Sequence, residues 1–224
     1  MQQIPLDFAI APEPTLDNFV AGANDEVLSA VRALAARSGA GCICLWGPPG
    51  CGRTHLLQAA VARVRAEGGA ACYATAALPA AEDALEAFLA VDDIESLDAA
   101  DQRRLFSLLD AAVRGDLRLL LAAGNAPMAL PLREDVRTRV ALGLVLQVRP
   151  LTDEQKREAL AAHARARGFE LPHDVGEYLL VHGRRDLPSL MAVLDAADRY
   201  SLQAKRPMSL PLVREVLERA RRAG

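Results

Sequence analysis

The stretch that most restricts how this chain can fold is GPPGCGRTH, residues 47–55. It follows an apolar run, CICLW, and precedes THLLQAAVARVRAEGG, whose apolar residues recur with helical spacing. The stretch fits the template G-x-x-x-x-G-K-[ST] except that Arg53 stands at the lysine position. A strand, a glycine-rich turn and a helix in this order predict a phosphate-binding loop. An ordinary glycine-rich turn between strand and helix is the alternative.

Short apolar runs recur along the first two thirds of the chain, separated by longer segments. They are residues 70–74, 87–91, 117–123 and 142–148. This alternation predicts an α/β fold with a parallel sheet covered on both faces. After Pro150 only helical patterns follow, and Thr152 with Gln155 predicts a capping box at the first of them. These patterns cover residues 152–168, 172–183, 187–205 and 209–222. We therefore expect a domain boundary near residue 150.

Composition excludes several classes of protein. The formal net charge is -3 and the aromatic content is 4%. The chain therefore lacks both the excess of basic residues that binds a phosphate backbone and the aromatic residues on which single-stranded bases stack, so bulk nucleic-acid binding is not expected. The N-terminal MQQIPLDF is not a secretory signal, and no apolar run is long enough to span a bilayer, so we expect a cytoplasmic protein. The four cysteines form no C-x-x-C, which favours buried, reduced thiols over metal ligands.

The predicted loop has the groups that hold a nucleotide. Backbone N–H groups would surround the phosphates, Arg53 would supply a cation, and the Thr54 hydroxyl would bind Mg²⁺. Arginine keeps the positive charge of lysine, but its planar fork is bulkier, so nucleotide binding is expected and fast hydrolysis is not. The predicted nucleotide-binding residues of the loop are Gly47, Pro48, Pro49, Gly50, Cys51, Gly52, Arg53, Thr54 and His55.

A pair of acids, Asp92 and Asp93, follows directly after the apolar run 87–91. A magnesium-dependent nucleotide site needs one acid at the end of a neighbouring strand and a second to orient water. A solvated strand end is the alternative. With the loop located, Asp92 is predicted to share Mg²⁺ with Thr54, and Asp93 to be the catalytic acid. Aspartate is one methylene shorter than the more usual glutamate, which again favours weak turnover.

Five segments resemble, in the same order, the successive sequence boxes of the AAA+ domain of the bacterial replication initiator DnaA. They are residues 15–31, 47–60, 91–97, 121–127 and 132–143. The similarity extends over residues 15–221, and in DnaA the acidic pair is also Asp-Asp. The resemblance implies an AAA+ P-loop fold with an N-terminal arm (1–14), an α/β nucleotide-binding subdomain (15–150) and a helical lid subdomain (151–224).

Within this family, arginine for lysine, a short chain and an N-terminal glutamine motif resemble the Hda-type regulatory inactivators. That resemblance implies a negative regulator of replication initiation that binds ADP, or ATP, with Mg²⁺. It would dock on the sliding clamp, the β subunit of DNA polymerase III, and stimulate hydrolysis of DnaA-bound ATP. Little or no sequence-specific DNA binding is expected, and homo-oligomer formation stays open.

The N-terminal QIPLDF indicates a peptide-binding motif by itself. In an extended peptide, residues two apart share a face, so Leu6 and Phe8 could enter one apolar pocket while Gln3 hydrogen-bonds at its rim. The spacing Q-x-x-L-x-F resembles the clamp-binding peptide of replication proteins. An arm packed on its own domain is the alternative.

The resemblance also assigns residues beyond the loop. Arg139, in VRTRVALG, matches the finger arginine that AAA+ proteins present to a neighbour's nucleotide, with Arg137 as the fallback. Arg185, in GRRDLPSLM, resembles the lid sensor arginine, with Arg184 as the alternative. Asn125 occupies the polar sensor position after its strand. A solvated surface charge is the alternative for each arginine.

Two other functions are compatible with such a domain. The first is an ATP-dependent initiator or helicase loader acting directly at DNA, for which an intact lysine, basic or aromatic DNA contacts, or a further DNA-binding domain would be expected. The second is a nucleotide-locked scaffold, in which Arg139 would be dispensable.

Overall fold

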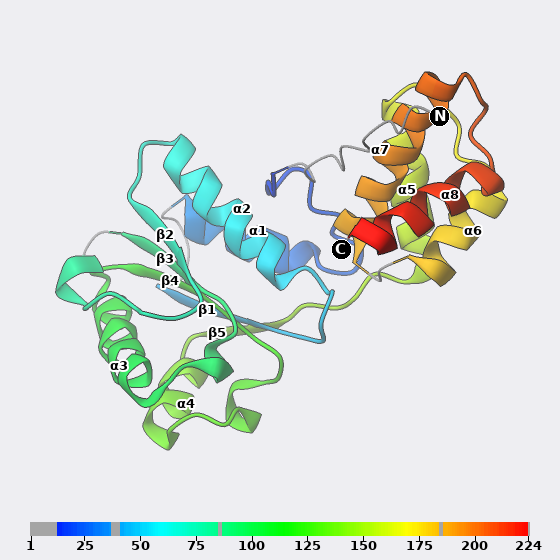
Figure 1. Cartoon of the computed structure of the whole chain (residues 1–224). Coiled ribbons are helices and arrows are strands. Elements are labelled where there is room, and N and C mark those ends of the chain that lie inside the picture. The colour runs from blue at the N-terminus through cyan, green and yellow to red at the C-terminus, as the bar shows by residue number, and fades with distance from the viewer. Residues whose placement is uncertain (1–12, 37–40, 85–86, 184–185, 224) are drawn as a thin grey trace. The chain divides into compact units, whose positions relative to one another are not determined.

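The computed structural model describes residues 13–36, 41–84, 87–183 and 186–223. They fall into two compact units, one from Glu13 to Pro150 and one from Leu151 onward. The first is an α/β unit, and the second contains helices and no strand among its described residues (Figure 1). None of the described helices combines the length and the apolar composition needed to cross a bilayer.

Within the described residues, five parallel strands form one sheet in the order β2-β3-β4-β1-β5. The strands are β1 (Cys42–Trp46), β2 (Ala71–Ala74), β3 (Phe88–Val91), β4 (Arg118–Ala123) and β5 (Leu144–Gln147). Trp46 pairs with Ala123, and Val91 pairs with Leu121, so the carboxyl ends of β1, β4 and β3 lie along one edge. The segments that follow these strands are therefore neighbours, which is where open α/β sheets bind ligands.

Helices cover both faces of this sheet (Figure 1). One face carries α1 (Asp25–Ala35) and α2 (Arg53–Ala66), and the other carries α3 (Ala99–Arg114) and α4 (Glu134–Ala141). Short 3-10 helices span Glu82–Ala84, Ile94–Ser96 and Pro127–Ala129. Ile43 and Leu45 pack on the α1 and α2 side, whereas Cys42 and Cys44 pack on the other, as the period of two in a strand requires. The predicted α/β fold with a covered parallel sheet is confirmed.

The helical unit contains α5 (Asp153–Ala166), α6 (His173–His182), α7 (Leu187–Ala204) and α8 (Leu210–Ala223). Its core is built from leucines and valines of all four helices, among them Leu160, Leu179, Leu194 and Val213. The predicted capping box is present, because Thr152 Oγ1 accepts from the Gln155 N–H at 3.1 Å and Gln155 Oε1 accepts from the Thr152 N–H at 3.0 Å.

One expectation about the cysteines is wrong. Cys42, Cys44 and Cys51 are buried, and burial raises the pKa of the Cys44 thiol to about 12, which makes it unreactive. Cys72, however, is exposed. It lies on β2, an edge strand on which no residue is fully buried. The burial expected for residues of a central strand therefore does not extend to Cys72.

Candidate nucleotide site

The loop after β1 is shaped to present backbone N–H groups. Gly47 donates to the Ala123 carbonyl at 3.2 Å, and Cys51 then donates to the Pro48 carbonyl at 3.3 Å to close a turn. Gly52 caps α2 with a φ of 104°, no side chain caps this helix, and its first turn contains no acid. The first N–H groups of α2 are therefore available to an anion, and the helix dipole favours one there.

Next to the loop, a carboxylate from a neighbouring strand meets the threonine hydroxyl. Asp92, at the end of β3 and only 2% exposed, accepts from Thr54 Oγ1 at 2.7 Å. It also accepts from Tyr73 Oη at 2.9 Å and from the Asp93 N–H at 3.0 Å. These three donors offset the cost of burying the carboxylate. Burial and the bond to Asp92 raise the pKa of Tyr73 to about 12, so Tyr73 remains a donor at neutral pH.

The donor set fits Mg²⁺ bound together with a nucleotide. Thr54 and Asp92 offer a hydroxyl and a carboxylate oxygen, the hard ligands that Mg²⁺ prefers beside phosphates and water. No cluster of three or more histidine, cysteine, aspartate or glutamate side chains among the described residues could hold a metal by itself. This pair would therefore hold Mg²⁺ only as part of a nucleotide complex, in which the ion would neutralise phosphate charge.

Arg53 has an unpaired nitrogen in this region. Its Nη1 is buried and has no hydrogen-bond partner, and an anionic ligand could supply one. Glu95 Oε1 accepts from the Gly124 N–H at 2.7 Å, while its Oε2 is buried without a partner. A β-carbon at Gly124 would lie 2.9 Å from Glu95 Oε1 and 3.9 Å from Arg53 Nη1, so both side chains approach this glycine. Glu95 thus joins the segment after β3 to the segment after β4.

The predicted catalytic acid, Asp93, follows Asp92 directly after β3. Its side chain is exposed, and its φ is 47°, in the left-handed region. Partial burial, reinforced by the charges of Asp92 and Glu95, raises its pKa, whereas Arg53 opposes this shift. Asn125, the predicted sensor, is also exposed and follows β4 directly after Gly124. The structure thus gathers the loop, both acids and Asn125 at one edge of the sheet.

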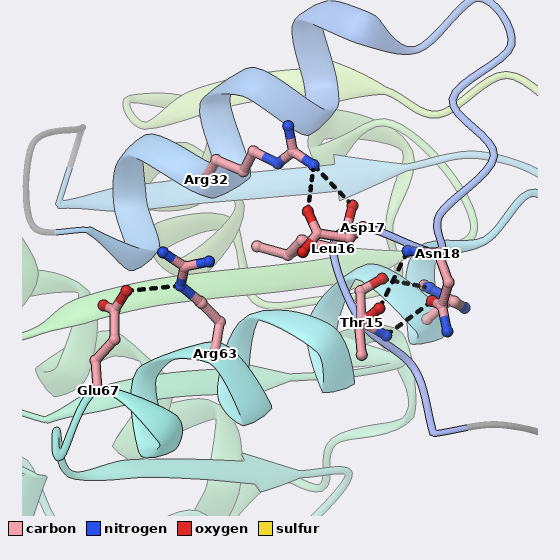
Figure 2. A network of polar contacts seen from close by, with 8 residues as sticks. Thr15, Leu16, Asp17, Asn18, Arg32, Arg63 and Glu67 are labelled. Carbon is pink, nitrogen blue, oxygen red and sulfur yellow. Dashed lines mark hydrogen bonds and ion pairs between the residues drawn. The ribbon is translucent and has the colours of Figure 1, made fainter.

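A segment before α1 braces the loop. Thr15 and Asn18 exchange reciprocal backbone-to-side-chain hydrogen bonds at 2.9 and 3.1 Å, and Arg32 Nη2 donates to the Leu16 carbonyl and to Asp17 (Figure 2). The Thr15 carbonyl accepts from His55 Nε2 at 3.0 Å, so this nitrogen carries the proton. His55 therefore uses its Nε2 within the chain, and burial lowers its pKa.

Phe19 continues this brace to the end of the loop. Its ring centroid lies 5.5 Å from that of His55, and a β-carbon on Gly52 would come within 2.8 Å of its Cε2 atom. Figure 2 also shows that Arg63 pairs with Glu67 along α2, at 2.6 Å. The loop is thus supported on one side by segment 15–19 and on the other by the sheet.

The two candidate finger arginines lie on α4, elsewhere in the α/β unit. Arg139 forms an ion pair with Asp110 of α3, and its guanidinium carbon lies 5.4 Å from the centroid of the Phe106 ring. Arg137 is half-buried, and its Nε has no hydrogen-bond partner. The remaining predicted residues, Gln3, Leu6, Phe8, Arg185 and its alternative Arg184, lie outside the described residues.

Sequence reasoning missed Tyr73, Glu95 and Phe19. Glu95 had a usable signal, because it is a third acid in DDIES directly after the predicted strand. Tyr73 had a weaker one, since it stands near the end of a run that becomes the strand next to β3. Phe19 had none, because an aromatic residue ahead of a helix carries no indication of which loop it will contact.

Together, the strand order, the phosphate loop, the Thr54–Asp92 pair and the helical unit define the class of AAA+ P-loop proteins. The comparisons agree on the fold. Domain III of the Thermotoga maritima replication initiation protein DnaA matches 96% of this chain over 98% of its own, at 18% identity and a TM-score of 0.72. AMPPCP-bound DnaA from Aquifex aeolicus matches 87% of this chain over 70% of its own, at 20% identity and a TM-score of 0.66.

The Thermotoga maritima RuvB Holliday junction branch migration motor is similar as well, over 93% of this chain and 72% of its own, at 19% identity and a TM-score of 0.66. At these identities the structural matches establish the fold alone. The more specific finding concerns residues 153–217, which match the family model described as the Hda lid domain. The chain therefore has the fold of AAA+ proteins such as DnaA domain III, and its residues 153–217 match the lid of the Hda family.

Proposed function

We propose that this protein is a negative regulator of chromosomal replication initiation. In this proposal it binds ADP with Mg²⁺, docks on the sliding clamp through residues 3–8, and stimulates hydrolysis of the ATP bound to DnaA. The Hda-type lid on a DnaA-like fold supports a DnaA-related role in replication. Docking on the clamp, the identity of the nucleotide and the action of an arginine in trans are what we add to this role as proposals.

The observation that carries the trans role is where Arg139 lies along the sheet. Arg139 shares a hollow with Gly41, Cys42 and Leu144, which mark the amino ends of β1 and β5. The phosphate loop begins at Gly47, beyond the carboxyl end of β1, and five residues of strand span about 16 Å. This separation favours action of Arg139 on a nucleotide held by another protein over action on the nucleotide of its own chain.

The protein's own nucleotide site, called the home site below, favours a bound nucleotide with weak turnover. Thr54, Asp92 and the N–H groups of α2 would supply the contacts to magnesium and phosphate. Arg53 replaces the compact lysine ammonium by a planar guanidinium, which would meet the outer phosphates with a different geometry. Weak turnover is thus attributed to Arg53 and to the short Asp93 side chain.

We expect the purified protein to bind ADP at least as tightly as ATP and to turn ATP over very slowly by itself. The reason is that Arg53 and Asp93 replace the lysine and the glutamate of a site that is otherwise complete. The measurements are the mass of the nucleotide released on denaturation and the steady-state ATPase rate. Brisk turnover that Arg53→Ala abolishes would contradict the expectation and favour the helicase-loader alternative, while Arg53→Lys serves as the charge-conserving control.

Clamp docking is tested with Leu6→Ala/Phe8→Ala. Each buried apolar side chain contributes about 1.5–3 kcal/mol, so removing both should weaken clamp binding at least about 100-fold. The same variant should lose stimulation of DnaA's ATPase on DNA-loaded clamp, because tethering raises the effective concentration of the two AAA+ proteins. Asp7→Ala is the control, since residue 7 points away from that face in an extended peptide. Equal clamp affinities of wild type and the double variant would refute docking by this motif.

A further inference from the structure

A tyrosine of the edge strand β2 contacts the buried carboxylate of the nucleotide site. Tyr73 Oη donates to Asp92 Oδ2 at 2.9 Å, and Thr54 Oγ1 donates to the same oxygen at 2.7 Å. The other oxygen, Oδ1, accepts from the Asp93 N–H at 3.0 Å. Hydrogen bonds thus hold both carboxylate oxygens, and they fix the plane of the carboxylate with them.

The register of β2 and β3 explains why this tyrosine reaches Asp92. Tyr73 pairs with Ala90 of β3. The Asp92 N–H donates to the carbonyl of Ala74, at the end of β2, at 2.9 Å. Residues two apart on a strand share a face, so Asp92 lies on the face of Ala90 and Tyr73. That face is covered by α2, which carries Thr54, so the two hydroxyls approach the carboxylate from a strand and from a helix.

The two hydroxyls that meet on Asp92 differ in their surroundings. Thr54 is exposed, and it is itself a predicted magnesium ligand. Tyr73 is partly buried, it packs against the apolar core on the α2 side of the sheet, and Gln58 of α2 approaches its hydroxyl. A tyrosine ring has only two side-chain torsions, so packing of the ring fixes the position of its oxygen. Tyr73 is therefore the side-chain donor to Asp92 that has no second task in the site.

We propose that Tyr73 is a positioning residue for the magnesium-binding carboxylate of Asp92, and that its hydroxyl sets how strongly Mg²⁺ increases the affinity for ADP. This inference rests on the proposed binding of ADP with Mg²⁺. Asp92 is only 2% exposed, so protein donors, and not bulk water, determine how its carboxylate is oriented. Groups that orient a metal ligand in this way typically contribute about 10–100-fold to metal affinity.

A purely structural role of the hydroxyl would have a different signature. If Tyr73 only offset the burial of Asp92, its loss would lower the free energy of unfolding and would alter ADP binding equally with and without Mg²⁺. If Tyr73 orients the carboxylate, only the part of the affinity that depends on Mg²⁺ should change. The dependence of ADP binding on Mg²⁺ therefore separates the two roles.

The test is Tyr73→Phe, which removes the hydroxyl and keeps the packed ring. In Mg²⁺ we expect an ADP affinity at least about tenfold below that of wild type, whereas in EDTA the two affinities should agree within about twofold. The half-saturating Mg²⁺ concentration at fixed ADP should rise by a similar factor. Tyr200→Phe is the matched control, because Tyr200 Oη donates to Glu215 Oε1, also at 2.9 Å, within the helical unit. This control should change neither quantity, and unfolding curves confirm that both variants fold.

A second measurement tests whether Tyr73 acts through Asp92. In the Asp92→Asn background the charge that Tyr73 orients is gone, so adding Tyr73→Phe should change the ADP affinity in Mg²⁺ by less than about twofold. The positioning role is overturned by a full Mg²⁺ effect in Tyr73→Phe, by an equal loss of affinity in EDTA, or by a further loss in the Asp92→Asn background. If wild type itself binds no ADP, or binds it equally with and without Mg²⁺, the proposed nucleotide site fails and this inference with it, so the two failures are distinguishable.

Discussion

Replacing Arg139 by alanine is expected to lower the stimulated rate of DnaA's ATP hydrolysis by at least about a thousandfold, the smallest effect usual for an arginine that acts in trans on a transferred phosphoryl group. The guanidinium would neutralise charge that develops on the partner's phosphate in the transition state. The measurement is phosphate release from ATP-bound DnaA with DNA-loaded clamp and either wild type or Arg139→Ala. Clamp affinity and the unfolding curve of the variant should match wild type.

The matched control for this experiment is Arg133→Ala. Arg133 lines a surface groove together with Arg139 and Phe106, and it pairs with Asp135 at 2.6 Å. Because Arg133 precedes α4 and is exposed, its loss should change the rate little. If Arg139→Ala stimulates like wild type, the assignment is wrong and Arg137→Ala is the next measurement. If neither change matters, the scaffold alternative accounts for the protein, because no cation is then supplied in trans.

Gly52→Ala is expected to have the largest effect on the home site. The φ of 104° at Gly52 disfavours any β-carbon, and that carbon would approach Phe19 to 2.8 Å. We expect a loss of about 3 kcal/mol in the free energy of unfolding, from backbone strain and from crowding against Phe19. ADP affinity should fall more than about tenfold, because the end of the loop would shift. Urea unfolding and titration with fluorescent ADP measure the two effects.

Gly68→Ala is the control that separates strain from crowding. Gly68 has a φ of 79° at the end of α2, and a β-carbon there would meet nothing within 4 Å. Its replacement should cost only about 1–2 kcal/mol, the backbone term, and leave ADP affinity unchanged. An ADP affinity of Gly52→Ala equal to wild type would show that segment 15–19 does not brace the phosphate loop.

Much of the nucleotide site could be predicted because its residues follow local patterns. Residues 47–54 form a contiguous motif, and Asp92 ends an apolar strand, so each could be recognised without knowing the fold. The structure brings Thr54 and Asp92 to 2.7 Å although 38 residues separate them, as parallel strands with aligned carboxyl ends require. The roles of residues 3–8 and of Arg185 stay predictions, since those residues lie outside the described part of the chain.

By itself, the sequence determined the alternation of strands and helices, the phosphate loop and the acid that meets it, because periodicity and short motifs are properties of neighbouring residues. Only the tertiary structure decided which distant side chains meet. It placed Tyr73 on Asp92, Glu95 on the Gly124 N–H and Asp110 on Arg139. Phe19 likewise came to rest beside Gly52 through folding alone. No local pattern encodes these contacts, since strand order and the packing of α3 against α4 arise from burying the apolar faces of the whole sheet.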